Sequence, residues 1–255
     1  MIDATTAYLG SRNLADPEFR IKSRFAPWID VLARIEGADL VAQHQHIFAT
    51  DWLTHTGEEL AAPAPPAPTM APDAATSVAF ATGPLLDHRG VPDVFLALIG
   101  AANHSLTITT PYFVPGEAIV SALRAAAIRG VTVRVILPRH NDSRFVALAA
   151  RSYFPTLTEA GVEIHAHTPG LLHAKTLLAD GRVALIGSAN LDRRSFELNY
   201  ENALLTEDPA LAASLATLHD VWLAQSRRIA AERVARWPWP RRLMDNLIAI
   251  LAPVL

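Results

Sequence analysis

The sequence predicts an α/β fold in which a mixed β-sheet is flanked by helices and the folding unit occurs twice, with the first copy incomplete. Three observations lead to this prediction. Apolar segments with strand and helix periodicity alternate through residues 76–230. A proline- and alanine-rich stretch, residues 61–75, precedes them and is expected to be a linker, because proline lacks an amide donor and favours extended geometry. A segment near the start of the chain recurs later in the sequence.

The expected elements of residues 76–230 follow one another in α/β order. We expect strands at 105–110, 131–137, 162–167, 174–179 and 183–186, and helices at 117–128 and 144–160. A glycine follows each helix, Gly130 and Gly161, as is common at helix C-termini. Asp180 and Gly181 are expected to form the tight turn between the last two strands. Residues 76–230 are therefore predicted to form one complete domain.

Residues 1–60 are interpreted as the end of a first copy of the same unit. The segment 3–14 aligns without gaps on the segment 180–191 and is identical to it at six positions. These six are Asp3, Ala7, Gly10, Ser11, Asn13 and Leu14, which align with Asp180, Ala184, Gly187, Ser188, Asn190 and Leu191. The match resumes at Trp52 and Trp222, each near the end of an apolar helix. We expect the two copies to face each other across a pseudo-two-fold axis.

Composition excludes several classes of protein. The chain has 51% hydrophobic residues, a net charge of −3 and no cysteine. Disulfides and thiolate metal sites are therefore excluded, and a nucleic-acid partner is not expected, since such proteins usually carry a basic face. The sequence shows neither a signal peptide at its start nor the ~20 apolar residues that a membrane-spanning helix needs. Any membrane contact is expected to be peripheral.

One motif carries the chemistry. His173, Lys175 and Asp180 have the spacing H-x-K-x4-D. On a strand, residues two apart point to the same face, so the imidazole and the ammonium can converge on one phosphate. Lysine occurs at only one other position, Lys22, and the chain otherwise uses arginine, so a compact ammonium is expected to matter here. Asp180 either contacts the substrate or holds the turn in place, and the sequence does not decide between these roles.

Residues downstream of the motif are expected to complete a phosphodiester site. Gly187 opens a small-residue turn in which Ser188 and Asn190 can donate hydrogen bonds to phosphate oxygens. Glu201 is expected to accept a hydrogen bond from the His173 imidazole and fix its tautomer. A histidine that attacks phosphorus, with Lys175 and Asn190 stabilising the charge, requires no metal and no cofactor.

The motif, the Gly-Ser-x-Asn that follows it and the duplicated unit resemble the phospholipase D superfamily. The segments 110–115, 141–144 and 169–175 narrow the resemblance to bacterial cardiolipin synthases, and the segment 28–30 of the first copy is similar to them as well. The resemblance implies a phospholipase D-like fold and transfer of a phosphatidyl group from one phosphatidylglycerol to another through a phosphohistidine, at the cytoplasmic side of the bacterial membrane. It also implies that the substrate is bound by Ser11, Asn13, Tyr112 and Gly187. Asp3 is then the remnant of the first copy's motif.

The first copy departs from the pattern of that family. Its histidine would fall seven residues ahead of Asp3, so we expect one intact histidine site and a missing partner site. Two alternatives stay open: a nuclease or phosphodiesterase of the same superfamily, in which self-association brings two histidines together, and a catalytically incomplete fragment that binds phospholipid. The tail, residues 231–255, combines tryptophans, arginines and an apolar helix, which suits either a membrane surface or packing on its own domain.

Overall fold

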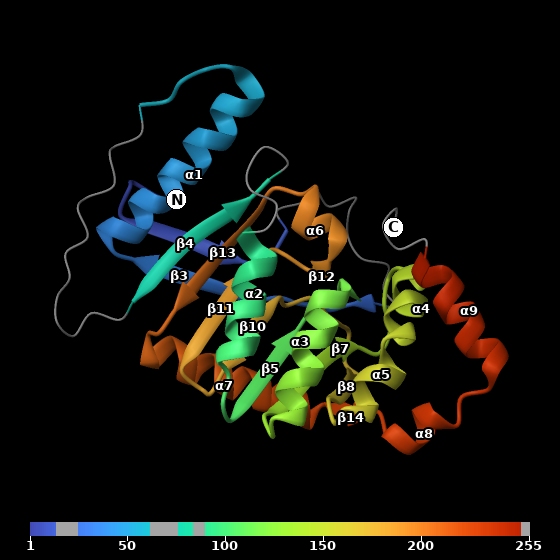
Figure 1. The fold of residues 1–255 in the computed structure, drawn as a ribbon. Coiled ribbons are helices and arrows are strands. Elements are labelled where there is room, and N and C mark those ends of the chain that lie inside the picture. Colours follow the sequence, from blue (N-terminus) through green and yellow to red (C-terminus); the bar gives the residue numbers. More distant parts are fainter. Residues whose placement is uncertain (14–24, 62–75, 84–89, 251–255) are drawn as a thin grey trace.

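A mixed sheet of eight strands forms the centre of the protein. The computed structural model describes residues 1–13, 25–61, 76–83 and 90–250. The strands lie in the order β14-β8-β7-β5-β10-β11-β13-β4 (Figure 1). β5, β7 and β8 are parallel, and the other neighbours pair antiparallel. The strands are β4 (Ser77–Thr82), β5 (Ser105–Thr109), β7 (Thr132–Pro138), β8 (Glu163–His167), β10 (Thr176–Ala179), β11 (Val183–Gly187), β13 (Glu201–Thr206) and β14 (Ser226–Arg228).

Helices cover both faces of this sheet. On one face lies the larger core, formed by α2 (Gly90–Ala101), α3 (Glu117–Ile128), α5 (Phe154–Glu159), α6 (Arg193–Glu197) and α8 (Ala231–Ala235) (Figure 1). The other face is covered by α7 (Pro209–Ala224). At one end of the molecule α4 (Arg144–Ser152) packs against α9 (Trp239–Ile250). The predicted fold class, a mixed sheet flanked by helices, is confirmed.

The first copy contributes a hairpin-like pair of strands and a helix. β1 (Thr6–Gly10) pairs antiparallel with β3 (Leu32–Glu36), and α1 (Ala38–Thr56) follows. Their apolar side chains share a core with β10, β11, β13 and α7, so the first copy is packed directly on the complete sheet. Four two-residue strands tie the loops together: β2 (Trp28–Ile29) pairs with β9 (Leu171–Leu172), and β6 (Phe113–Val114) pairs with β12 (Leu191–Asp192).

The backbone reproduces the internal repeat. Asp3 and Ala4 have φ angles of 48° and 53°, and their counterparts Asp180 and Gly181 have 53° and 64°. The bridge between Ile2 and Thr6 corresponds to the pair Ala179 and Val183 at the end of the β10–β11 hairpin. Both copies therefore contain the same left-handed turn, and β1 is the structural counterpart of β11.

Two expected elements differ in detail from the observed ones. The helix expected at 144–160 is divided into α4 and α5 near Tyr153, because Pro155 has no amide to continue the hydrogen bonding of α4. The strand expected from residue 174 begins at Thr176, so His173 and Lys175 precede it. Apart from its first residue, the expected linker at 61–75 lies outside the described residues. In the tail, α8 and α9 are described and residues 251–255 are not.

Candidate active site

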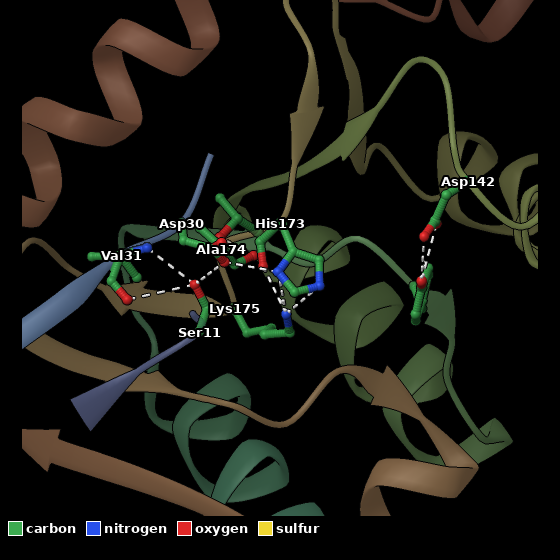
Figure 2. A network of polar contacts seen from close by, with 9 residues as sticks. Ser11, Asp30, Val31, Asp142, His173, Ala174 and Lys175 are labelled. Atoms are coloured by element: carbon green, nitrogen blue, oxygen red, sulfur yellow. Dashed lines mark hydrogen bonds and ion pairs between the residues drawn. The ribbon is translucent and has the colours of Figure 1, made fainter. Parts of the chain in front are cut away.

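His173 and Lys175 are buried together in the segment between β9 and β10. The Lys175 Nζ lies 3.0 Å from both ring nitrogens of His173 and donates to the His173 carbonyl oxygen at 2.8 Å (Figure 2). The Thr109 hydroxyl at the end of β5 donates to the carbonyl oxygen of Ala174, which lies between them. The end of the parallel strand β5 thus fixes the backbone that presents the imidazole and the ammonium.

A carboxylate and an aromatic ring from the first copy complete the surroundings of His173. The short pairing of β2 with β9 places the carbonyl oxygen of Ile29 within 2.8 Å of the His173 amide. Asp30 Oδ1 then lies 2.7 Å from His173 Nδ1 (Figure 2). Trp28 stacks on the imidazole with ring centroids 4.4 Å apart and an interplanar angle of 15°. The sequence drew attention to 28–30 as a family resemblance but did not assign these residues to His173.

This arrangement fixes one tautomer of His173. Because Asp30 accepts a hydrogen bond from Nδ1–H, the other nitrogen, Nε2, is left as the one that can accept or donate a proton. The Ser11 hydroxyl donates to the same Asp30 oxygen at 2.7 Å and accepts from the Val31 amide at 3.0 Å. Ser11 therefore orients the carboxylate, and the substrate contact expected of it stays a prediction.

Burial and charge act on the two partners of His173 in opposite ways. Burial alone raises the pKa of Asp30, but hydrogen bonds from His173 and Ser11 and the charge of Lys175 outweigh it, so the pKa of this carboxyl is below its ordinary value. Burial lowers the pKa of Lys175 to about 8, although the charges of Asp30 and Glu201 oppose the shift. The Lys175 ammonium therefore loses its proton more readily than that of an ordinary lysine.

Glu201 does not orient His173 as expected. Its carboxylate accepts from the Ser188 hydroxyl and, at 3.1 Å, from the Asn199 side-chain Nδ2, while Asp30 bonds to His173 Nδ1. The repeat explains the contacts of Glu201. Ser188 bonds to Glu201 and to the backbone amide of Asn202. In the same way Ser11 bonds to Asp30 and to the backbone amide of Val31.

Asp30 and Glu201 are thus equivalent positions of the two copies. Asp30 serves the histidine of the other copy. Within the described residues Glu201 makes no hydrogen bond to His173, but its charge acts on Lys175.

Asp180 and Asp3 occupy matching turns of the two copies. The Asp180 carboxylate accepts from the backbone amides of Asn103, His104 and Ser105 at 2.7 to 2.9 Å. Seven residues of nearly extended chain, at ~3.3 Å each, separate it from His173 by roughly 20 Å. These three contacts agree with the turn-holding role that the sequence left open, and a catalytic role of Asp180 stays a prediction. Asp3 occupies the matching turn of the first copy and is exposed.

The remaining expected site residues lie at the same edge of the sheet with different contacts. Asn190 bonds through its backbone and side-chain nitrogens to the Ser195 hydroxyl, and its buried Oδ1 has no hydrogen-bond partner among the described residues. The next residue, Leu191, donates its amide to the Thr110 hydroxyl at 3.2 Å, directly after the Thr109 that holds the His173 segment. The direct convergence of Asn190 on His173 and Lys175 stays a prediction.

The other three residues expected at the site, Gly187, Asn13 and Tyr112, differ in their surroundings. A Cβ on Gly187 would lie 2.7 Å from the Asn202 carbonyl oxygen, so glycine is required there for strand contact. Asn13 is exposed. The Tyr112 hydroxyl donates to the Asp142 carboxylate at 3.0 Å. Figure 2 shows Asp142 apart from the His173 cluster. Burial and the nearby charge of Asp142 raise the pKa of Tyr112.

Comparisons with known proteins identify the family. A family model described as "Cardiolipin synthase, PLD-like domain" matches residues 95–222, half of the chain. The chain belongs to this family. The predicted membership of the phospholipase D superfamily, among bacterial cardiolipin synthases, is thereby confirmed.

Curated relatives and solved structures agree with the family assignment. Cardiolipin synthase A of Serratia proteamaculans (strain 568) is 36% identical over 259 residues, and that of Cronobacter sakazakii (strain ATCC BAA-894) is 38% identical. Each match covers 100% of this chain and 53% of the relative, so the chain spans about half the length of these relatives.

Two crystal structures share the fold. The phosphatidylserine synthase of Haemophilus influenzae Rd KW20 superposes with a TM-score of 0.61 at 14% identity, covering 89% of this chain and 64% of that one. The phospholipase D family member Nuc of Salmonella typhimurium has a TM-score of 0.54 at 21% identity, covering 62% of this chain and 99% of Nuc.

Proposed function

We propose that this chain forms the second half of a cardiolipin synthase-type phosphatidyltransferase, which joins two phosphatidylglycerols into cardiolipin and releases glycerol. One observation carries the proposal. The His173 imidazole is held between Lys175 and a carboxylate from the first copy, with its Nδ1 bonded to Asp30 and its Nε2 3.0 Å from the Lys175 Nζ. That arrangement suits a histidine that gives and takes protons at a phosphodiester.

The reaction needs a second imidazole, and we propose that it comes from a first-copy histidine whose carboxylate partner is Glu201. That histidine attacks phosphorus of phosphatidylglycerol, forming a phosphohistidine, and the P–O bond to glycerol breaks. His173 gives its Nε2 proton to the departing glycerol oxygen. It then takes the proton of the hydroxyl of a second phosphatidylglycerol as that oxygen attacks phosphorus, which releases the first histidine and yields cardiolipin. Lys175 stabilises the charge on the phosphoryl oxygens in both steps.

The substrate of such a reaction lies in a membrane, and we propose peripheral binding at its cytoplasmic side. Within the described residues no helix combines the length and apolarity that spanning a bilayer requires. The proposal needs phospholipid as partner and does not involve nucleic acid.

The test is turnover of labelled phosphatidylglycerol in mixed micelles. Three proteins are compared: the 255-residue chain, a chimera that joins it to the preceding half of the Serratia relative, and the chimera with His173→Ala. We expect cardiolipin from the chimera alone, because general acid–base transfer contributes ~10²–10⁴ in rate and requires the second imidazole.

Each other outcome has a definite meaning. Cardiolipin formation by the chimera that survives His173→Ala would refute the role given to His173. Release of phosphatidic acid in place of cardiolipin would identify a phosphodiesterase, the alternative considered from the sequence. Robust synthesis by the 255-residue chain alone would show that the first-copy histidine is dispensable.

A further inference from the structure

A cavity rich in arginine lies at the edge of the sheet near β8 and β14, under α4, α8 and α9. Its volume is about 430 Å³. Six arginines contribute to its lining: Arg139, Arg151, Arg227, Arg228, Arg233 and Arg241. Among the described residues that line it there is no carboxylate. For a chain whose net charge is −3, this is a strong local concentration of positive charge.

The positive charge of this cavity is only partly neutralised. Asp245 pairs with Arg151 at 3.0 Å and more distantly with Arg241, and Glu163 is shared between Arg228 and an arginine outside the cavity. Within the described part of the chain the other three arginines of the lining have no ion-pair partner. Burial lowers the pKa of Arg241, and the charges of Arg151 and Arg233 lower it further against the opposing effect of Asp245. The arrangement therefore favours an anion.

The chemistry of the lining fits a phosphate group next to an apolar body. Guanidinium groups present planar pairs of donors that match phosphate oxygens. Trp237, Phe113 and Phe154 supply an apolar wall, and Arg241 stacks over the Trp237 ring at 3.8 Å. This cavity is distinct from the His173 site, although Phe113 follows Tyr112 on the segment between them.

The helix that supplies Arg241 has its apolar side turned to solvent. Trp239, Leu243, Leu247 and Ile250 of α9 are 74%, 50%, 50% and 72% exposed. Their spacing of three to four residues places them on one face, which we call the α9 ridge. The opposite face carries Asp245, which is 2% exposed and bonded to Arg151. In Figure 1, α9 lies at the outer edge of the molecule beside α4.

We propose that the arginine cavity binds the phosphate of an anionic phospholipid headgroup while the α9 ridge enters the acyl region of the same leaflet. A membrane is favoured over a soluble anion because the same helix supplies both a cavity arginine and the exposed apolar ridge, and interfacial helices combine these features. The binding does not depend on phosphatidyl transfer at His173. It adds a second lipid contact to the one proposed at His173.

The test measures binding of the His173→Ala chain to sedimented vesicles, so that turnover has no influence on the result. Vesicles of phosphatidylcholine are compared with equimolar phosphatidylcholine and phosphatidylglycerol. The cavity variant is Arg227→Gln with Arg233→Gln, and its control is Arg124→Gln with Arg182→Gln, which makes the same charge change at exposed arginines outside the cavity. The ridge variant is Leu243→Gln with Leu247→Gln, and its control is Leu218→Gln with Val221→Gln on exposed positions of α7.

We expect binding to the anionic vesicles only. The cavity variant should lose about 30-fold in partition coefficient, which corresponds to about 1 kcal/mol for each arginine at an anionic surface. The ridge variant should lose at least about tenfold, and both controls should bind like the parent. If either variant binds like its control, the proposal fails. If inorganic phosphate protects the cavity from arginine modification but vesicles do not, the ligand is a free anion and the proposal is equally overturned.

Discussion

Replacing Asp30 by asparagine tests whether the first copy governs the chemistry of His173. The substitution keeps the shape and an oxygen acceptor but removes the charge that stabilises a protonated imidazole. The two side chains are only 11% and 5% exposed and their atoms are 2.7 Å apart, so solvent screens the interaction little. A hydrogen bond to a charged group contributes about 1.5–3 kcal/mol, which predicts a fall in kcat of about 10- to 150-fold with KM little changed. A fall near ~10⁴ is expected only if the tautomer changes as well.

Two measurements together decide the Asp30 prediction. Turnover is followed in the chimera with the Serratia half, and the protonation of the two His173 nitrogens is read from their ¹⁵N shifts in the 255-residue chain. We expect Asp30→Asn to perturb the shift of Nδ1, whereas Glu201→Gln leaves it unchanged. Glu36→Gln, a neutralisation of an exposed carboxylate on β3, serves as the control for charge alone. Unchanged kcat and unchanged His173 shifts in Asp30→Asn would refute the cross-copy assignment.

Three further substitutions follow from the same geometry. Lys175→Met should abolish turnover yet raise Tm, with a gain of about 1–3 kcal/mol in the free energy of unfolding at neutral pH. The reason is that the pKa of Lys175 is about 8 in the folded protein against an ordinary 10.5, so folding disfavours its charged form. For the same reason the stability of the unsubstituted chain should rise from pH 8 to 10.5, because the unfolded state binds more protons there. Turnover should fall above pH 8 as Lys175 loses its charge. A stability and a turnover that do not change with pH in this range would contradict both expectations. Asp180→Ala should cost about 2–3 kcal/mol in urea unfolding, because a charged acceptor and a turn at φ 53° are lost, with kcat per folded molecule unchanged. Gly170→Ala should lower kcat about as much as Asp30→Asn, since its Cβ would lie 2.2 Å from the Pro27 carbonyl oxygen and push β2 from β9; normal turnover would show that the β2–β9 contact tolerates displacement.

Most of the elements that local patterns predicted are observed close to their expected bounds. The helix at 117–128 coincides with α3, and the turn at Asp180 and Gly181 has the expected left-handed backbone. Both depend on residues close in sequence, so periodicity and turn chemistry suffice to find them. Pro155, which lacks an amide donor, indicated the division between α4 and α5, but the apolar spacing continues through it and predicted a single helix.

The partner of His173 required information that no local pattern contains. Asp30 lies 143 residues before the histidine, and only the docking of the first copy on the sheet brings them together. The repeat contains the equivalence of Asp30 and Glu201, but its ungapped alignment does not reach these residues. Ser188 and Glu201 are 13 residues apart, while Ser11 and Asp30 are 19 apart, so an ungapped alignment loses the match before it reaches the carboxylates. Extending the repeat with a gap would have shown that Glu201 has an equivalent, although not which histidine each one serves.

The short pairing of β2 with β9 has a consequence for how such a protein can be divided. The family match begins at residue 95 and includes His173 and Lys175, but it leaves out both Trp28 and Asp30. A protein expressed within those boundaries would keep the recognisable motif and lose the groups that set the orientation and tautomer of its histidine. A substitution in the loop before β3 therefore changes the surroundings of His173, a residue that lies in the other copy.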